Sequence, residues 1–244
     1  MAKFHGKNIR VYVEGYDISG YTNSLDIEQS ADVVDVAAFS SASKEYVVGL
    51  YDSKVTHDGF FDDAGTAGGH AVLSERIGSS VNFMALINPQ AGGHSFAGSA
   101  ELIDSYSIAA SIAGAVTHKS KMSNFGTQGV DPTVTIFPRG TMAAAGTSVA
   151  VSTPQNTAGG RAYIQNFGSY GLSAPGSADG LGTVFLIGAA DAAFTVGTAV
   201  IASFGSQGTL PSASGLAFSG SALFMKLLQG GGLGRPQVAV TVDI

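Results

Sequence analysis

Acidic side chains gather early in the chain, where they could serve in hydrolysis. Asp26, Glu28, Asp32 and Asp35 lie close together in the sequence, and strand alternation would place Asp26 and Glu28 on one face. Glycoside hydrolysis needs two carboxyl groups that face each other across a cleft, in different electrostatic surroundings. Sugar sites also usually contain aromatic platforms, and the chain has no tryptophan. The pattern therefore disfavours a glycosidase.

A second polar cluster, His57-Asp58 with Asp62-Asp63, could bind a metal ion. It lacks the D-x-[DN]-x-[DN]-G spacing that wraps a loop around Ca²⁺. The five histidines include no i, i+4 pair of the HExxH type. We predict no metal site and interpret the cluster as a solvated hairpin end, with calcium binding as the less favoured alternative.

Nucleophile and phosphate motifs are also missing. The chain has no cysteine and no G-x-S-x-G elbow. The glycine run 230–234 is followed by Arg235-Pro236 and a predicted strand, so no helix N-terminus is available to bind phosphate. We predict no catalytic residue, no cofactor and no enzymatic activity, although a triad assembled from distant residues stays an alternative.

Composition favours a β-rich globular chain. Of 244 residues, 45% are hydrophobic, only 12% are charged and 34 are glycine, a balance typical of many strands joined by turns. The net charge of −6 disfavours tight duplex binding, which needs clustered Lys and Arg. There is neither a signal-peptide pattern nor a long apolar run, so we expect a soluble protein that is made in a cytoplasm.

Charge divides the chain into two predicted domains, 1–145 and 146–244. Residues 1–139 hold nine Lys/Arg and fifteen Asp/Glu, whereas residues 140–244 hold three of each. A short helix is predicted over Ala71–Ile77, after Gly68-Gly69. The strands predicted in the first domain are Ile9–Glu14, Ser24–Glu28, Val33–Phe39, Ser53–Phe61, Ser80–Ile87, His94–Ala109, Gly114–Lys121 and Thr133–Pro138. Those of the second are Val149–Ser152, Arg161–Phe167, Gly182–Ile187, Ala199–Phe204, Ala222–Leu228 and Gln237–Val242.

Several spaced segments together resemble the N-terminal pattern of phage tail tube (major tail) proteins. The resemblance covers roughly residues 7–138, and residues 160–244 are similar to the extra β domain that many such proteins carry. The segments are Asp17-Ile18-Ser19-Gly20, Ser24-Leu25, Asp32 to Asp35, Ala38-Phe39, Lys44 to Leu50, Lys54-Val55 to Gly59-Phe60, Ser105-Tyr106-Ser107 and Ala113-Gly114-Ala115-Val116.

This resemblance implies a mainly β fold: a tail-tube-type β-sandwich with one short flanking helix, plus a second C-terminal β domain. It implies hexameric rings that stack into a conduit for DNA during ejection. Asp26, Glu28, Asp32 and Asp35 are then candidates to face the lumen, because an acidic surface repels phosphate backbones. A loop near Ser40–Tyr51 is expected to bridge to the next ring. Its candidate contact residues are Ser41, Lys44, Glu45, Tyr46, Gly49 and Leu50.

The resemblance also implies a set of partners. They are further copies of the chain, a tape measure protein, and tail terminator and tail-tip proteins. DNA would pass transiently without specific binding, and no membrane insertion is expected. The protein would reside in the virion tail after assembly in the host cytoplasm. Alternatives are a capsid decoration or tail-tip protein of a phage, and, less favoured, a β-sandwich glycan-binding module or hydrolase.

Overall fold

The computed structural model describes residues 6–38, 43–62, 68–124, 129–141, 151–152, 160–169, 182–189, 199–207, 212–218, 224–230 and 236–243. Within these ranges the chain is mainly β, with a single short α-helix, so the predicted fold class is confirmed. Its contacts divide it into two compact units. Unit 1 comprises residues 1–20, 81–99 and 131–244, and unit 2 comprises residues 21–80 and 100–130.

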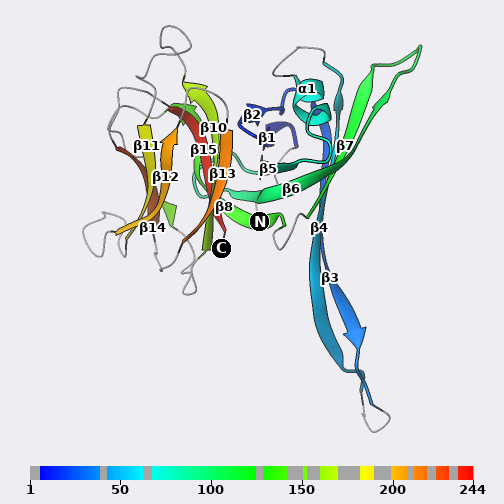
Figure 1. The fold of residues 1–244 in the computed structure, drawn as a ribbon, viewed down its shortest axis with the longest axis horizontal. Helices are drawn as coiled ribbons and strands as arrows, with labels where there is room; N and C mark the ends of the chain where they lie inside the picture. Colours follow the sequence, from blue (N-terminus) through cyan, green and yellow to red (C-terminus); the bar gives the residue numbers. More distant parts are fainter. Residues whose placement is uncertain are drawn as a thin grey trace. The chain divides into compact units, whose positions relative to one another are not determined.

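The strands of unit 1 come from three separate stretches of sequence (Figure 1). They are β1 (Arg10–Val13), β2 (Tyr16–Asp17), β5 (Ser80–Leu86), β8 (Asp131–Thr141), β9 (Val151–Ser152), β10 (Gly160–Ser169), β11 (Gly182–Ala189), β12 (Ala199–Gln207), β13 (Ser212–Phe218), β14 (Phe224–Gly230) and β15 (Pro236–Asp243). The short 3₁₀ turn η1 (Gly6–Asn8) precedes them. The strand β6 (His94–Ala109) contributes its first half to unit 1 and its second half to unit 2.

Unit 1 contains two sheets. The first follows the order β13-β10-β15-β8-β6-β5-β1-β2, and the second follows β12-β11-β14-β9. Strand β12 approaches β13 and β10, and β14 approaches β8, so the sheets pack as layers. Because β15 pairs with both β8 and β10, strands from either side of residue 145 share one sheet. The boundary near residue 145 stays a prediction.

The core of unit 1 covers both faces of its central strand β15. In β15 the side chains of Ala239, Val240, Thr241 and Val242 are all buried, because this central strand is covered on both faces. A cluster of buried residues joins β1, β5, β6, β10 and β15. It consists of Tyr12, Met84, Leu86, Ala97, Tyr163 and Ala239.

One buried amide ties the β1–β2 turn to the rest of unit 1. Glu14 and Gly15 both have positive φ, 50° and 80°, as a two-residue type I′ hairpin turn requires. The Gly15 amide donates a hydrogen bond to Oε1 of Gln165 at 2.6 Å, and Nε2 of Gln165 donates to the Asn82 carbonyl at 3.1 Å. The Gln165 side chain is therefore a polar bridge between β10, β5 and the turn.

Replacing Gln165 with leucine is expected to lower the free energy of unfolding by about 2 kcal/mol, because the buried Gly15 amide loses its acceptor and the Asn82 carbonyl keeps only the Glu14 amide as a donor. Urea denaturation followed by circular dichroism measures this loss. The exposed Gln90 is the matched control, and Gln90→Leu should change the free energy by less than about 0.5 kcal/mol. Equal effects of both substitutions would contradict the bridging role.

Unit 2 is a four-stranded antiparallel sheet with a short helix on one face. Its order is β3 (Thr22–Asp35), β4 (Tyr46–Phe60), β7 (Thr117–Asn124) and the second half of β6. The helix α1 (Gly69–Ser74) buries Ala71, Val72 and Leu73, in agreement with the helix predicted over Ala71–Ile77. The chain after α1 is fixed to β6 by hydrogen bonds between Gly78, Ser79 and Ile103.

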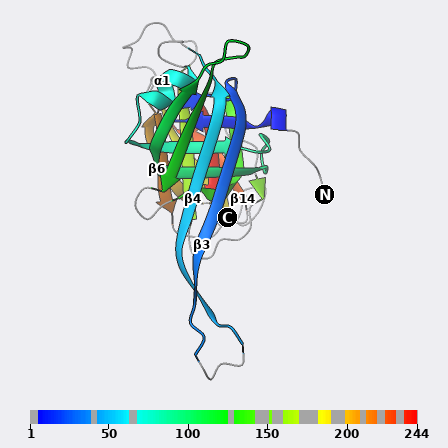
Figure 2. The ribbon, with the colours of Figure 1, turned by 90° about the vertical axis from the view of Figure 1, so that its right-hand side faces the viewer.

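The hairpin of β3 and β4 extends well beyond the sheet. The last β4–β7 pair is Lys54 with Ser123, whereas β3 and β4 continue to pair as far as Asp35 with Tyr46. We call the described residues 31–38 and 43–51 the arm (Figure 2). The predicted loop Ser40–Tyr51 was therefore too long, since β4 begins at Tyr46. Valine and tyrosine favour extended pairing, and Val47 and Val48 face Val34 and Val33.

Candidate assembly surfaces

One face of the unit 2 sheet is polar and faces away from the buried side chains. Along β4 the burial alternates, with Val55 and His57 buried and Lys54 exposed. The strand register aligns equivalent positions on β3, β7 and β6. We define the outer face by the residues on this side of the sheet: Ser24, Asp26, Glu28, Lys54, Thr56, Asp58, Ser105, Ser107, Lys119 and Lys121.

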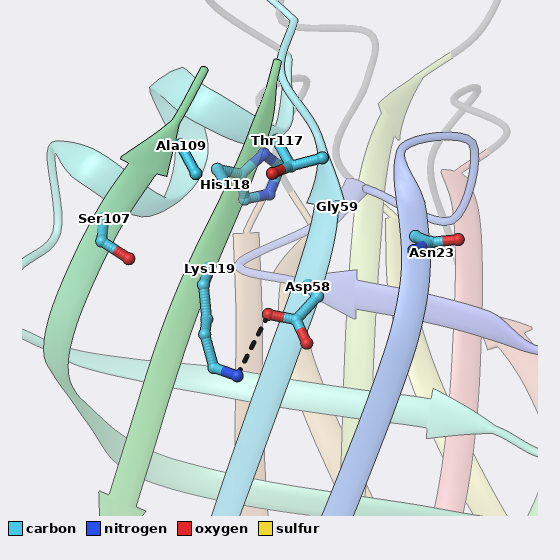
Figure 3. A pocket seen from close by; sticks show the side chains of 8 residues that line it. All are labelled: Asn23, Asp58, Gly59, Ser107, Ala109, Thr117, His118 and Lys119. Atoms are coloured by element: carbon cyan, nitrogen blue, oxygen red, sulfur yellow. Dashed lines mark ion pairs between the residues drawn. The ribbon is translucent and has the colours of Figure 1, made fainter. Parts of the chain in front are cut away.

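Charges on the outer face are arranged in pairs. Nζ of Lys119 lies 3.4 Å from Oδ1 of Asp58, its cross-strand neighbour, in a shallow hollow of about 360 Å³ (Figure 3). Nζ of Lys54 lies 2.8 Å from Asp52, whose hydrogen bond and charge raise the pKa of Lys54. Glu28 is the cross-strand neighbour of Lys54. The face thus presents no uninterrupted basic strip of the kind that binds duplex DNA.

The four acids predicted from the sequence separate into two groups. Asp26 and Glu28 lie on the outer face, as the alternation predicts, next to a hollow of about 310 Å³. Asp32 and Asp35 are exposed on the arm instead. The sequence analysis did not predict that the lysines of β7 belong to the same surface as these acids. Lys119 lies far from β3 in the sequence, and only the pairing of β3 with β4 and of β4 with β7 brings the lysines and the acids onto one face. That these acids face a lumen stays a prediction.

The arm exposes an unusual amount of apolar surface. Leu50 is 80% exposed and Tyr51 is 79% exposed. Among the described residues of the arm, eight large apolar side chains are at least 47% exposed: Val33, Val34, Val36, Tyr46, Val47, Val48, Leu50 and Tyr51. Apolar patches on soluble monomers seldom exceed a few hundred Å², and larger ones mark interaction sites. The arm is therefore a candidate for contact with another protein.

The predicted loop residues can now be placed. Tyr46, Gly49 and Leu50 lie in β4, whereas Lys44 and Glu45 lie just before it, and Ser41 is outside the described residues. Gly49 has a local reason to be glycine. A Cβ built there would lie 3.1 Å from Cβ of Asp32, where the pairing register shifts. Whether these residues contact a neighbouring ring stays a prediction.

A second exposed apolar surface lies at the hairpin between β6 and β7. We call residues 108–116 the tip; they contain no charged residue. Ile108 is 50% exposed, Val116 is 39% exposed, and Ile112 is fully exposed. Isoleucine at the end of a hairpin is not needed for the turn, so these side chains are also candidates for contact with another protein.

The unit 2 sheet leaves two strand edges open among the described residues. Strand β3 pairs only with β4, and β6 beyond Ile103, where Gly78 and Ser79 bond to its backbone, pairs only with β7. Open edges carry unpaired backbone N–H and C=O groups and are ready to pair with another strand. Along β3 this edge is long, and it has no proline to interrupt it.

The opposite, buried face of the sheet contains a cluster of histidines. His57 and His118 are fully buried and stack with ring centroids 5.3 Å apart. His118 also stacks on Tyr106, whose hydroxyl group lies 2.9 Å from Nδ1 of His70 on α1. Gly59 makes room for this packing, because a Cβ there would lie 2.7 Å from the His118 ring and from the Tyr21 carbonyl.

Burial controls the ionisation of this cluster. Burial, together with the nearby His118, lowers the pKa of His57 to about 4, while Asp58 acts in the opposite direction. Burial and the neighbouring His70 also lower the pKa of His118, an effect offset in part by the Phe60 backbone. Nε2 of His57 bonds to Oγ1 of Thr22 at 2.9 Å. The imidazoles of His57 and His118 are thus held neutral at neutral pH as core residues.

The described residues contain no group of three or more His, Asp or Glu side chains arranged to hold a metal ion. Asp63, part of the second polar cluster, lies outside them, whereas His57 of that cluster points into the core. No helix within the same ranges is long and apolar enough to cross a membrane.

Comparison with known proteins gives matches among solved structures alone. No protein-family model and no curated protein match the chain. One similar structure is a virion of a native gene transfer agent particle. It has 21% sequence identity and a TM-score of 0.42, and the match covers 52% of this chain and 98% of that chain.

Two further structures show a similar degree of likeness. A chain of an extracellular contractile injection system, the PVC sheath–tube complex in its extended state, has 12% identity and a TM-score of 0.42. That match covers 54% of this chain and 92% of the other. The SPP1 Dit protein, a hub of the adsorption apparatus in phages that infect Gram-positive hosts, has 8% identity and a TM-score of 0.34, and the match covers 96% and 98%. Because the TM-scores of these three structures are below 0.5, we draw the functional inference from the chain's own residues.

Proposed function

We propose that this protein is a structural subunit of a phage-type tail tube. Copies would form hexameric rings, and stacked rings would form the conduit through which DNA passes during ejection. The observation that carries the proposal is the unit 2 sheet, which combines two open edges, a polar outer face and a projecting apolar arm. Open strand edges and exposed apolar surface both favour contact with another chain.

The strand order supports ring closure. With four antiparallel strands, the edge strands β3 and β6 run in opposite directions. When copies are placed side by side in one orientation, β6 of one copy therefore meets β3 of the next as an antiparallel pair. Repeating this contact around a ring gives one continuous antiparallel sheet, and closure removes every open edge.

In such a ring the outer face would line the channel. Two of its three lysines form ion pairs, Lys54 with Asp52 and Lys119 with Asp58, and Asp26 and Glu28 add negative charge near the β3 edge. A surface of this kind does not attract a polyanion, because non-specific DNA binding requires free positive charge. DNA would move past it without adhering.

The remaining parts of the proposal follow from this role. The lumen would hold a tape measure protein before ejection, and terminator and tail-tip proteins would bind the tube ends. The chain would act as an architectural subunit and not as an enzyme. It would assemble in the host cytoplasm and reside in the virion tail. Residues 146–244 would form an additional β domain outside the channel.

Electron microscopy of the purified protein tests the assembly. We expect rings of six subunits or tubes at high protein concentration, with analytical ultracentrifugation reporting the same species. Discrete monomers at every concentration and salt condition would overturn the proposal.

Charge reversal on the outer face tests the channel role. In the double variant Asp26→Lys, Glu28→Lys, we expect tubes assembled in the presence of short duplex DNA to protect at least about tenfold more DNA from nuclease than wild-type tubes, most strongly at low salt. Glu75→Lys, an exposed position after α1, is the control and should leave DNA protection unchanged. Equal protection by wild type and the double variant would exclude a channel role for Asp26 and Glu28.

A further inference from the structure

We infer that the tip of one copy is the surface on which the arm of another copy docks. The inference rests on the proposed function in that it names the contact that joins successive rings. It starts from the two apolar projections of unit 2. Residues 31–38 and 43–51 form the arm, and residues 108–116 form the tip.

The arm and the tip project from opposite ends of the same sheet. Strands β4 and β7 pair from Phe60 with Thr117 to Lys54 with Ser123. The tip continues beyond Thr117, whereas the arm continues beyond Lys54 in the other direction. Figures 1 and 2 show the two hairpins of unit 2 pointing away from each other along the strand direction.

This arrangement suits a head-to-tail contact. Two different surfaces at opposite ends form a heterologous interface, and repeating it along one direction gives an open filament. An arm–arm contact would instead be a closed two-fold dimer, which would leave every tip uncovered. Only the arm–tip contact covers both apolar surfaces in every copy except those at the ends.

The size of the apolar surface also fits an interface between copies. Eight large apolar side chains, each at least 47% exposed, amount to roughly the 800 Å² that one partner contributes to a standard interface. The tip adds Ile108, Ile112 and Val116, and it carries no charge that would have to lose its water on docking. Within the described part of unit 2, the apolar side chains of both surfaces stay exposed.

Cysteine pairs test the contact directly, because the chain contains no cysteine of its own. A Leu50→Cys variant and an Ile112→Cys variant, of which one carries a size tag, are mixed, assembled and treated with a short thiol–thiol crosslinker. We expect a heterodimer at a yield at least fivefold above that from Leu50→Cys mixed with Ile77→Cys. Ile77 is half exposed but lies in neither surface. The second pair is Tyr51→Cys with Val116→Cys. It would report a contact in which the arm lies closer to Val116 of the tip than to Ile112.

Each outcome has one interpretation. Heterodimers from either pair support the inference. Homodimers of Leu50→Cys alone would indicate arm–arm pairing and overturn it. Rings or tubes in the microscope without any heterodimer would overturn the inference and leave the proposed function standing. Monomers alone, without crosslinks, would overturn both.

A single substitution gives an independent readout. Ile112→Asp is expected to shorten tubes at least tenfold or release separate rings, while the urea midpoint stays unchanged because the side chain is fully exposed. Ile77→Asp is the control and should leave tube length unchanged. Full-length tubes formed by Ile112→Asp would overturn the inference.

Discussion

Two charges on the arm are expected to abolish assembly while leaving the subunit folded. In the variant Val48→Asp, Leu50→Asp, both substituted side chains are more than half exposed in the free subunit, so the free energy of unfolding should change by less than about 1 kcal/mol. In a ring stack each carboxylate would be buried without a partner, at a cost of several kcal/mol. Because six contacts would join each pair of rings, the critical concentration for tubes should rise more than about a hundredfold.

Sedimentation and electron microscopy measure the critical concentration, and urea denaturation measures the fold. The control is Glu75→Lys, which changes charge at an exposed position outside the arm and the tip. Tubes of normal length at the wild-type critical concentration would exclude the arm from assembly. Loss of tubes together with a much lower urea midpoint would show that the substitutions act on folding instead.

Acidification is expected to destabilise unit 2 through its buried histidines. The pKa of His57 is about 4 in the folded protein and near 6.5 in the unfolded chain. The unfolded state therefore binds more protons than the folded state between these values, and stability falls as the pH falls from about 6.5 to about 4. His57 alone accounts for a loss of about 3 kcal/mol over this window. Because the pKa of His118 is also lowered, it acts in the same direction.

Urea denaturation at a series of pH values measures the slope. In His57→Gln the titrating group is gone, while a polar side chain remains beside Thr22, so the loss of stability over the window should shrink by about 3 kcal/mol relative to wild type. His94, which is exposed on β6, is the matched control, and His94→Gln should keep the wild-type slope. An unchanged slope in His57→Gln would contradict the account of the cluster.

Much of the fold could be predicted from local pattern. The strand predicted over His94–Ala109 coincides with β6, and the helix predicted from Gly68-Gly69 and its apolar residues forms as α1. Because the sequence has no cysteine and no metal-binding spacing, it favoured the prediction of an assembly role over a catalytic one. These predictions succeeded because strand alternation, turn residues and helix spacing depend on neighbours a few positions apart.

Other features required the tertiary structure. Spacing placed Asp26 and Glu28 on one face, but only the β3–β4–β7 register brought Lys54, Lys119 and Lys121 beside them. The sequence marked His57 and Asp58 as one polar cluster, whereas the sheet turns His57 into the core and Asp58 to the outer face. Only Val33–Phe39 of the arm was predicted as a strand; residues 40–51 were predicted as a loop because the polar connection concealed the pairing of Val33 with Val48.

By itself, the sequence determined a mainly β chain, its short helix and most of its strands, though not β2 and β13, since each depends on a local repeat of apolar and polar residues. The tertiary structure decided which charges share a face, which histidines are buried and which apolar residues stay uncovered. Those properties depend on strand pairing between residues far apart in the chain, and strand pairing follows from the shared core and not from any local pattern. The projecting arm and tip belong to this second group, and they carry the proposal of assembly.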